Sequence, residues 1–340
     1  MRGYTVAGNG LDTLRVVDLP DPPAPAAGEA VVRALAVTLN YRDLMVAEGR
    51  YGQPLKAPMI PCSDACGVVE AVGPGVRGLA PGDRVVNTAI RNWPCGALRR
   101  EHQRAFSGGG GVGGVLAERF AYPADALVKA PAHLSDEEAA ALPVAGLTAW
   151  AALVPFAGAR AGDWVLSHGT GGVSIFAAQL GARMGLRVVL STSSESKGKL
   201  VRERFGVAAT VDYRDPEWPA AVRALTGGEG VDVLLETAGG ATFARSIEAM
   251  AFGGRIAVIG VLDGDEGPAS LVRILARQLR VGGIYMESTA ELRAFARAVE
   301  AWRLHPCIDS VFSFAEAPAA YRHLAAGSHL GKVAIRVAER

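Results

Sequence analysis

The sequence predicts an α/β protein in which a doubly wound parallel sheet is joined to a second unit made mainly of β-strands. Between about residues 160 and 285, short apolar runs recur, and several are continuous Val, Leu and Ile runs, as expected for parallel strands covered on both faces. Their spacing of roughly 20–25 residues leaves room for a crossover helix each time. Before residue 125, short apolar runs bounded by turn-forming residues indicate an all-β barrel or sandwich.

These patterns divide the chain into elements and domains. The strands expected in the parallel sheet are residues 164–167, 187–192, 209–211, 231–237, 255–261 and 280–285. A helix is expected over 290–301. The apolar run at 331–337 is expected to be a short strand, and its pattern matches that of the N-terminal part better than that of the α/β region. We therefore expect one domain over 1–125, rejoined by about 290–340, and a nucleotide-binding α/β domain over 126–289.

Composition limits the classes of partner and ligand. The 340 residues are enough for about two domains. Lys+Arg 35 against Asp+Glu 34 gives a net charge of +1, so we expect no nucleic-acid or anionic-membrane partner. Four scattered cysteines are too few for a disulfide scaffold, and neither a signal peptide nor a membrane span is evident. We expect a cytoplasmic protein that binds small molecules.

A glycine-rich loop between an apolar run and a helical pattern gives the sharpest local signal. The segment reads Trp-Val-Leu-Ser-His-Gly-Thr-Gly-Gly-Val-Ser over residues 164–174. Gly169 permits a tight turn, Gly171 lets the backbone approach a pyrophosphate, and the helix start at Gly172 and Val173 supplies free N–H groups. The third position of this dinucleotide-binding fingerprint is Ser174, which is small enough to fit. The alternative is a strand–helix turn that binds nothing.

The end of the next strand bears on which nucleotide is bound. NAD binders usually place Asp or Glu there to hold the ribose 2′-hydroxyl. Here the strand runs into hydroxyl residues including Ser193, followed by Glu195 and Lys197. Hydroxyls and a lysine suit a 2′-phosphate, so NADP(H) is favoured over NAD(H). Glu195 could instead reach the ribose, and Lys197 could be a solvated helix residue.

Several further motifs together resemble one enzyme family. They lie at residues 28–32, 40–43, 61–69, 82–85, 142–150, 169–176 and 260–262. In order and spacing they resemble the medium-chain dehydrogenase/reductase superfamily, within it the zinc-free branch that includes the quinone oxidoreductases. The resemblance implies a GroES-like β domain formed by both chain ends around a Rossmann domain, and a homodimer or homotetramer.

The resemblance also bears on metal binding. Zinc members of the family hold a catalytic metal with a Cys, a His and a second Cys, and the matching positions here are Asn40, Ser63 and Val144. Zn²⁺ prefers thiolate, imidazole or carboxylate ligands, which none of these residues supplies. The lobe near residues 87–107, which carries four cysteines in zinc members, contains only Cys95. We therefore expect no zinc.

The missing ligands favour a particular chemistry. Zinc polarises a carbonyl or stabilises an alkoxide. Hydride addition to a quinone or to the β-carbon of an enone places the charge on a delocalised oxygen, which one or two hydrogen-bond donors can stabilise. The sequence therefore favours NADPH-dependent reduction of a quinone, an enone or an enoyl thioester.

Two residues are the candidate catalytic donors. Asn40 takes the place of the first metal ligand of zinc members and is expected near the nicotinamide. Tyr51 resembles the tyrosine that related enoyl reductases place beside the substrate as a proton donor, and a phenol stays protonated at neutral pH. Alternatively, Asn40 caps a turn and Tyr51 is a surface loop residue.

The resemblance assigns the remaining cofactor contacts. Thr148 resembles a threonine that touches the nicotinamide, and Tyr213 resembles a tyrosine beside the adenosine phosphate. Gly260 and Val261 end a strand at the carboxyl edge where such ligands bind. Lys332 is a weaker candidate for a phosphate contact. His168 precedes the glycine turn. A histidine at a strand end with no acidic partner is more often structural, and we expect that role for it.

Two alternative functions remain open at this stage. One is a zinc-independent alcohol or aldehyde dehydrogenase. The other is an NADPH-binding protein with little turnover and a structural or regulatory role. The glycine loop does not separate them, because all three proteins would bind nucleotide.

Overall fold

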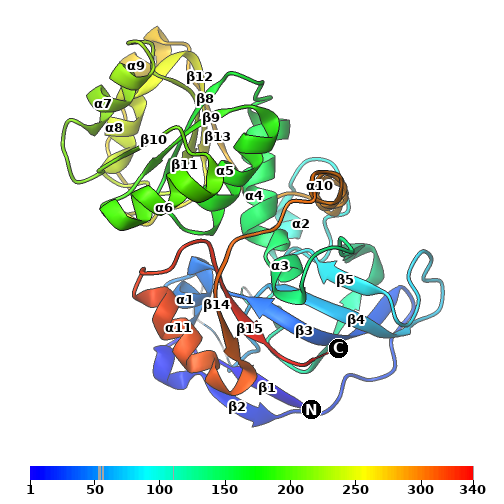
Figure 1. Cartoon of the computed structure of the whole chain (residues 1–340). Helices are drawn as coiled ribbons and strands as arrows, with labels where there is room; N and C mark the ends of the chain where they lie inside the picture. Colours follow the sequence, from blue (N-terminus) through cyan, green and yellow to red (C-terminus); the bar gives the residue numbers. More distant parts are fainter. Residues whose placement is uncertain (53–54, 56, 110, 340) are drawn as a thin grey trace. The chain divides into compact units, whose positions relative to one another are not determined.

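The chain forms two compact units. The computed structural model describes residues 1–52, 55, 57–109 and 111–339. Unit 1 consists of Met1–Leu147 and Glu287–Arg340, and unit 2 consists of Thr148–Met286. The chain therefore leaves unit 1 once and returns to it for its last segment (Figure 1).

A parallel sheet forms the centre of unit 2. Within residues 148–286, all of which are described, six strands pair in the order β10-β9-β8-β11-β12-β13, and every pairing is parallel. They are β8 (Trp164–His168), β9 (Arg187–Ser191), β10 (Ala209–Val211), β11 (Val231–Glu236), β12 (Met250–Val258) and β13 (Arg280–Gly283). This order is that of a doubly wound Rossmann sheet, so the predicted fold class is confirmed.

Helices cover both faces of this sheet. They are α5 (Gly172–Met184), α6 (Glu195–Phe205), α7 (Trp218–Leu225), α8 (Thr242–Glu248) and α9 (Leu271–Ala276), and α4 (Leu147–Ala151) precedes β8 in the chain. Helices α5 and α6 pack on each other, and α8 packs between α7 and α9. Figure 1 shows these two groups on different sides of the sheet. The continuous apolar strands are therefore buried, as Val165, Val189 and Leu234 show with no exposed surface.

Unit 1 is built on an extended, mainly antiparallel sheet. In its described part the strands are β1 (Arg2–Thr5), β2 (Arg15–Asp18), β3 (Glu29–Thr38), β4 (Asp64–Val72), β5 (Arg84–Asn87), β6 (Arg119–Pro123), β7 (Leu127–Lys129), β14 (Ile308–Ser313) and β15 (Lys332–Arg336). The main sheet runs β14-β15-β3-β4-β5-β7, and β6 also pairs with β3. Strand β15 lies antiparallel to β3, which brings the end of the chain beside residues 36–38.

Unit 1 also contains helices, several of which pack against strands of its sheet. In its described part the helices are α1 (Tyr41–Ala47), α2 (Arg100–Gln103), α3 (Asp136–Ala140), α10 (Thr289–Trp302) and α11 (Ala317–Ala325). Helix α3 packs against β3 and β4, and the unit therefore continues to Leu147, beyond the boundary that the sequence placed near residue 125. The core joins the sheet to α1 and α11 through buried side chains such as Leu44 and Tyr321.

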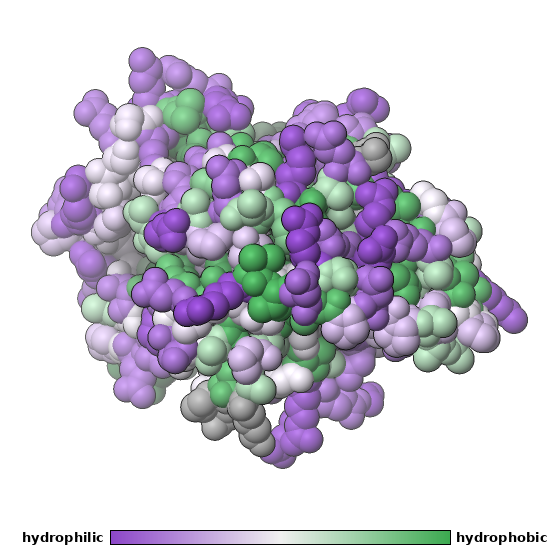
Figure 2. All heavy atoms as spheres, turned by 90° about the horizontal axis from the view of Figure 1, so that it is seen from below, coloured by the Kyte–Doolittle hydropathy of each residue, from purple (hydrophilic) through white to green (hydrophobic). Residues whose placement is uncertain are grey.

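The surface has a mixed character. On the face drawn in Figure 2, hydrophilic side chains separate small apolar areas. Among the described residues, no helix combines the length and the apolar character that crossing a membrane requires.

Candidate active site

The glycine loop of unit 2 has the geometry of a phosphate-binding turn. Strand β8 ends at His168, and Gly169 follows with φ 79°, a left-handed conformation that favours glycine. Gly171 has extended backbone, and a Cβ built there meets nothing within 4 Å, so the space above this peptide is open. Helix α5 begins at Gly172, where the first N–H groups have no acceptor within the helix. The residues fit an anionic pyrophosphate.

Ser174 fills the third position of the fingerprint. Its side chain is buried, accepts a hydrogen bond from Ser167 Oγ at 2.9 Å and donates one to the carbonyl of His168 at 2.7 Å. The hydroxyl therefore ties the first turn of α5 to the end of β8. Serine in place of glycine at this position thus adds two hydrogen bonds at the turn, and its side chain is small enough for the helix to pack against the strand.

The end of β9 gathers the residues expected at the ribose. Ser194 caps α6 by accepting from the backbone N–H of Lys197, and the Lys197 side chain is half-buried. Ser193 Oγ lies 2.9 Å from Tyr213 Oη, so these two predicted residues are in contact.

Arg214 belongs to this group although it was not among the residues predicted from the sequence. Its Nη2 donates to the Ser193 carbonyl at 2.9 Å, and its guanidinium pairs with Asp212 at 2.7 Å. A signal was available, since Arg214 directly follows Tyr213. The structure thus places an Arg214–Asp212 ion pair beside the hydroxyls at the end of β9.

The other predicted contacts in unit 2 lie on neighbouring segments. A Cβ at Gly260 would lie 2.6 Å from the Thr237 carbonyl, so only glycine allows this close approach of two loops. Val261 is 40% exposed, as suits a residue at a ligand-facing edge. Thr148 is buried in α4, the first residue of unit 2. Because β8, β9, β10 and β12 are parallel, the segments that follow them share the carboxyl edge of the sheet.

Asn40 lies in a hydrogen-bonded network within unit 1. It precedes α1, and its backbone N–H donates to Asp43 Oδ2 at 2.8 Å. Its Oδ1 accepts from Lys332 Nζ at 2.6 Å, and its Nδ2 donates to Asp64 Oδ2 at 2.9 Å. Both ends of the amide are therefore held, and the half-buried side chain has one fixed orientation.

The position of Lys332 corrects the prediction of a phosphate contact. The side chain is buried, donates to the Leu39 carbonyl at 2.7 Å and lies 3.7 Å from Asp64 Oδ2. Burial lowers the pKa of Lys332, while the carboxylates of Asp64 and Asp43 oppose that change. Strand β15 pairs with β3, and this pairing brings Lys332 next to Leu39 and Asn40. The ammonium group therefore donates to protein oxygens.

A second buried ion pair adjoins this network. Arg42 Nη1 lies 3.2 Å from Asp43 Oδ1, and both side chains are at most 9% exposed. Burial raises the pKa of Asp43 to about 6, although Arg42 and the Asn40 N–H favour the carboxylate. Two cations and two carboxylates are thus buried together around the start of α1.

Tyr51 packs on the same arginine. The Arg42 guanidinium lies 4.9 Å from the centre of the Tyr51 ring and 4.0 Å from the centre of the Phe106 ring. The Tyr51 ring is partly buried against the core of unit 1. Tyr51 is therefore not simply a surface loop residue, which was the alternative considered from the sequence.

The three positions that match zinc ligands carry other chemistry here. Ser63 Oγ donates to Asp64 Oδ1 at 2.7 Å, and Asp64 in turn accepts from Asn40, so two of the three positions are linked through one carboxylate. Val144 is half-buried and supplies hydrocarbon. In the part of the chain that the structure describes, no three His, Cys, Asp or Glu side chains are placed to hold a metal ion.

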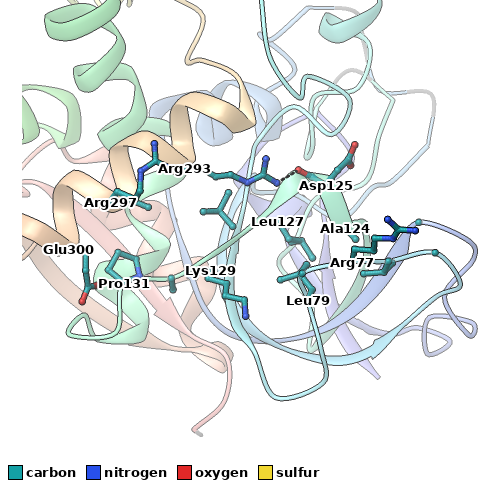
Figure 3. Close-up of a pocket in the computed structure, with 17 residues that line it drawn as sticks. Arg77, Leu79, Ala124, Asp125, Leu127, Lys129, Pro131, Arg293, Arg297 and Glu300 are labelled. Atoms are coloured by element: carbon teal, nitrogen blue, oxygen red, sulfur yellow. Dashed lines mark hydrogen bonds between the residues drawn. The ribbon is translucent and has the colours of Figure 1, made fainter.

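A groove of about 740 Å³ in unit 1 lies elsewhere, between α10 and the turn after β4 (Figure 3). Arg77, Arg293 and Arg297 are among its lining residues, and Arg293 donates to the Asp125 carbonyl at 3.0 Å. Figure 3 shows Arg77 and Arg297 pointing away from each other. The described residues that line it include none of the predicted site residues.

Comparisons with known proteins identify the family. Residues 26–132 match the model of the alcohol dehydrogenase GroES-like domain, and residues 172–301 match that of the zinc-binding dehydrogenases. The chain is 34% identical over 336 residues to a zinc-type alcohol dehydrogenase-like protein of Schizosaccharomyces pombe, covering 97% of this chain and 96% of that protein. The chain belongs to the medium-chain dehydrogenase/reductase superfamily. It is an oxidoreductase of this superfamily, and "zinc-binding" is here part of a family name.

Solved structures of the superfamily share the fold along the whole chain. An NAD-dependent alcohol dehydrogenase is 37% identical with a TM-score of 0.90, covering 99% of this chain and 100% of that one. A mycobacterial quinone oxidoreductase is 29% identical with a TM-score of 0.81, with the same coverage. A mycobacterial protein in complex with NADPH is 30% identical with a TM-score of 0.83, again with that coverage. Superfamily members similar to this chain thus include NAD- and NADPH-binding proteins.

Proposed function

We propose that this protein is an NADPH-dependent reductase that transfers hydride to a quinone, an enone or an enoyl thioester without a catalytic metal. The observation that carries the proposal is the Lys332–Asn40–Asp64 network. It occupies the position that resembles the first metal ligand of zinc members, and it fixes an uncharged amide there.

The network does not fit Zn²⁺. The Asn40 oxygen already accepts from the Lys332 ammonium at 2.6 Å, so a dication bound to this oxygen would lie beside a like charge. Ser63 and Val144 supply a hydroxyl and hydrocarbon, which are not the ligands of structural or catalytic zinc sites. The carboxylate of Asp64 is engaged by Asn40, Ser63 and Lys332.

The amide suits the charge that forms on a conjugated acceptor. Bound NADPH would supply the hydride. One Nδ2 proton of Asn40 is donated to Asp64, and the second is available to donate to the enolate or hydroquinone oxygen. The Tyr51 hydroxyl then supplies a proton to the substrate, with its ring held against Arg42 and Phe106.

The end of β9 supports NADPH over NADH. Ser193, Lys197 and Tyr213 offer two hydroxyls and an ammonium, and Arg214 adds a guanidinium bound to the Ser193 carbonyl and paired with Asp212. Cations and hydroxyls complement a ribose 2′-phosphate. The open backbone at Gly171 and the start of α5 at Gly172 and Val173 would hold the pyrophosphate.

An exposed apolar surface of unit 2 supports a homodimer. Strand β13 lies at the edge of the six-stranded sheet, and Val281 on it is 40% exposed. On α9, Leu271, Val272 and Leu275 are each at least 74% exposed. An exposed edge strand beside apolar side chains is suited to pairing with a second copy. Sedimentation at micromolar concentration tests this, with a dimer or tetramer expected and a monomer contradicting it.

A zinc-independent alcohol dehydrogenase is the second candidate. It is favoured by the NAD-dependent alcohol dehydrogenase that is 37% identical to this chain. The same network would then stabilise an alkoxide rather than an enolate. Fold alone does not separate the two reactions.

The deciding experiment compares the two directions of hydride transfer. NADPH oxidation is measured with a naphthoquinone, an enone and an enoyl thioester, and NADP⁺ or NAD⁺ reduction is measured with a panel of alcohols. The proposal predicts that at least one conjugated acceptor is turned over faster than every alcohol. Faster alcohol oxidation supports the second candidate, and tight NADPH binding without turnover shows a nucleotide-binding protein instead.

A further inference from the structure

His168 has an acidic partner that the sequence does not reveal. Its Nε2 lies 3.4 Å from Glu236 Oε2, although the two residues are 68 positions apart. Strands β8 and β11 are neighbours in the sheet, so their last residues meet below the carboxyl edge. The expectation that His168 lacks such a partner is therefore wrong.

Glu236 is an ionised carboxylate inside unit 2. Its side chain has no exposed surface. Burial acts to raise the pKa of Glu236, but hydrogen bonds and charge from His168 and bonds from its other donors outweigh burial and lower it. His168 is the basic side chain that lies against this buried carboxylate, with Nε2 3.4 Å from Oε2.

The pair is tied to two turns of the nucleotide edge. Glu236 Oε1 accepts from the backbone N–H groups of Ala238 at 2.8 Å and Gly239 at 3.0 Å. The His168 carbonyl accepts from Thr237 Oγ1 at 3.0 Å, which joins the two turns directly. Gly169, the first residue of the phosphate turn, follows His168 in the chain.

Hydroxyls from two other elements complete the surroundings of the imidazole. Nδ1 lies 3.0 Å from Ser191 Oγ at the end of β9, and Nε2 lies 2.9 Å from Ser246 Oγ on α8. The backbone N–H of Gly169 donates to the Ser191 carbonyl at 2.9 Å. The Trp218 ring lies edge-on to the imidazole, at 5.4 Å between ring centres. His168 thus connects β8, β9, β11 and α8 at one point below the glycine turn.

We propose that the buried His168–Glu236 pair positions the nucleotide-binding edge, holding the Gly169–Gly171 turn and the 237–240 loop in the conformation that receives the cofactor. The inference rests on the proposed nucleotide site. Neither residue is a catalytic residue, because His168 is only 6% exposed and Glu236 is fully buried. Both act through the backbone groups that they hold.

The chemistry of the pair dictates the variants. H168Q replaces the imidazole that faces the buried Glu236 carboxylate at 3.4 Å with a neutral amide, and so removes the ring contacts to Ser191, Ser246 and Glu236. E236Q keeps an acceptor for the two backbone N–H groups but removes the charge. The double variant H168Q/E236Q places two neutral amides together, which can donate to and accept from each other. It keeps the inference testable if H168Q does not fold.

The experiment measures NADPH affinity, thermal unfolding and backbone amide exchange for each variant. V222A is the control, because Val222 is a fully buried core residue of the same unit on α7. We expect H168Q to weaken NADPH binding about tenfold, which corresponds to about 1.4 kcal/mol, and the double variant to recover most of that loss. Exchange should rise at 169–172 and 237–240 in H168Q and E236Q, and not in V222A.

The outcomes separate this inference from the proposed function. Single variants that unfold earlier but bind NADPH and protect both turns as the wild type does would show a purely structural pair. A double variant that binds as weakly as the single variants, although both turns exchange normally, would also overturn the positioning role. A wild-type protein that binds neither NADPH nor NADH would overturn the nucleotide site itself.

Discussion

The glycine turn of unit 2 and the Asn40 network of unit 1 are built in different ways. The turn uses backbone groups of successive residues, and Gly169 and Gly171 act mainly by lacking a side chain. The network uses side chains that come from β15, the start of α1 and the start of β4. A site made of backbone groups of consecutive residues can be predicted from the sequence. A site made of side chains from distant segments depends on how the strands pair. The following variants test that difference.

The largest effect is expected for Lys332→Met. This change leaves Asp64 and the Asn40 oxygen without their buried cation, and breaking a buried ion pair costs about 3–5 kcal/mol of unfolding free energy. Chemical denaturation measures it. The matched control is Lys129→Met, because Lys129 is 61% exposed and pairs with Asp83 at 3.0 Å. An exposed pair contributes about 0–1 kcal/mol, so equal losses in the two variants would refute the role of burial.

Asn40→Ala should act on turnover. Loss of a preorganised donor to a developing oxyanion lowers kcat roughly hundredfold. NADPH affinity should stay unchanged, because the proposed pyrophosphate and ribose contacts all lie in unit 2. Steady-state kinetics with a naphthoquinone and a binding titration measure the two quantities. Asn92→Ala is the control, since Asn92 is an exposed asparagine of the same unit. A kcat equal to that of the control would remove Asn40 from the proposed site.

Two glycine variants separate backbone strain from ligand approach. Gly171→Ala should weaken NADPH binding about tenfold, or about 1.4 kcal/mol, because the methyl group enters open space where the pyrophosphate would lie. Its unfolding free energy should change by less than about 0.5 kcal/mol, since its φ of −77° suits alanine. Gly169→Ala should instead lose about 1–2 kcal/mol of stability at φ 79°. Unchanged NADPH affinity in Gly171→Ala would contradict the phosphate site.

Lys197→Ala should discriminate between the two cofactors. A charge-assisted contact to a 2′-phosphate contributes about 1.5–3 kcal/mol, so NADPH affinity should fall about tenfold or more while NADH affinity stays constant. Lys199→Ala is the control, because Lys199 is 73% exposed and faces Glu203 at 3.9 Å. Equal losses for NADPH and NADH in Lys197→Ala would disprove the 2′-phosphate role.

The sequence predicted the parallel sheet well because its evidence is local. Each strand is a short apolar run, and the chain between runs has room for a helix. Strand β12 begins at Met250, which pairs with Val231, rather than at residue 255. The expected strand began too late because Gly253 and Gly254 have the composition of a turn.

Contacts within the candidate site could be predicted only where residues that are neighbours in space are also neighbours in sequence. The turn at Gly169 and the serine cluster after β9 could be recognised from spacing alone. The Asn40–Lys332 contact could not, because the two residues are 292 positions apart and meet only through the antiparallel pairing of β15 with β3. The same applies to Glu236, which meets His168 only because β8 and β11 are neighbours.

Hydride transfer without a metal is best tested by the zinc content of the active protein. The purified chain is dialysed against a chelator, its zinc is determined by elemental analysis, and NADPH oxidation with a naphthoquinone is measured on the same sample. We expect full activity with far less than stoichiometric zinc. Activity that disappears with the chelator and returns with stoichiometric zinc would contradict it.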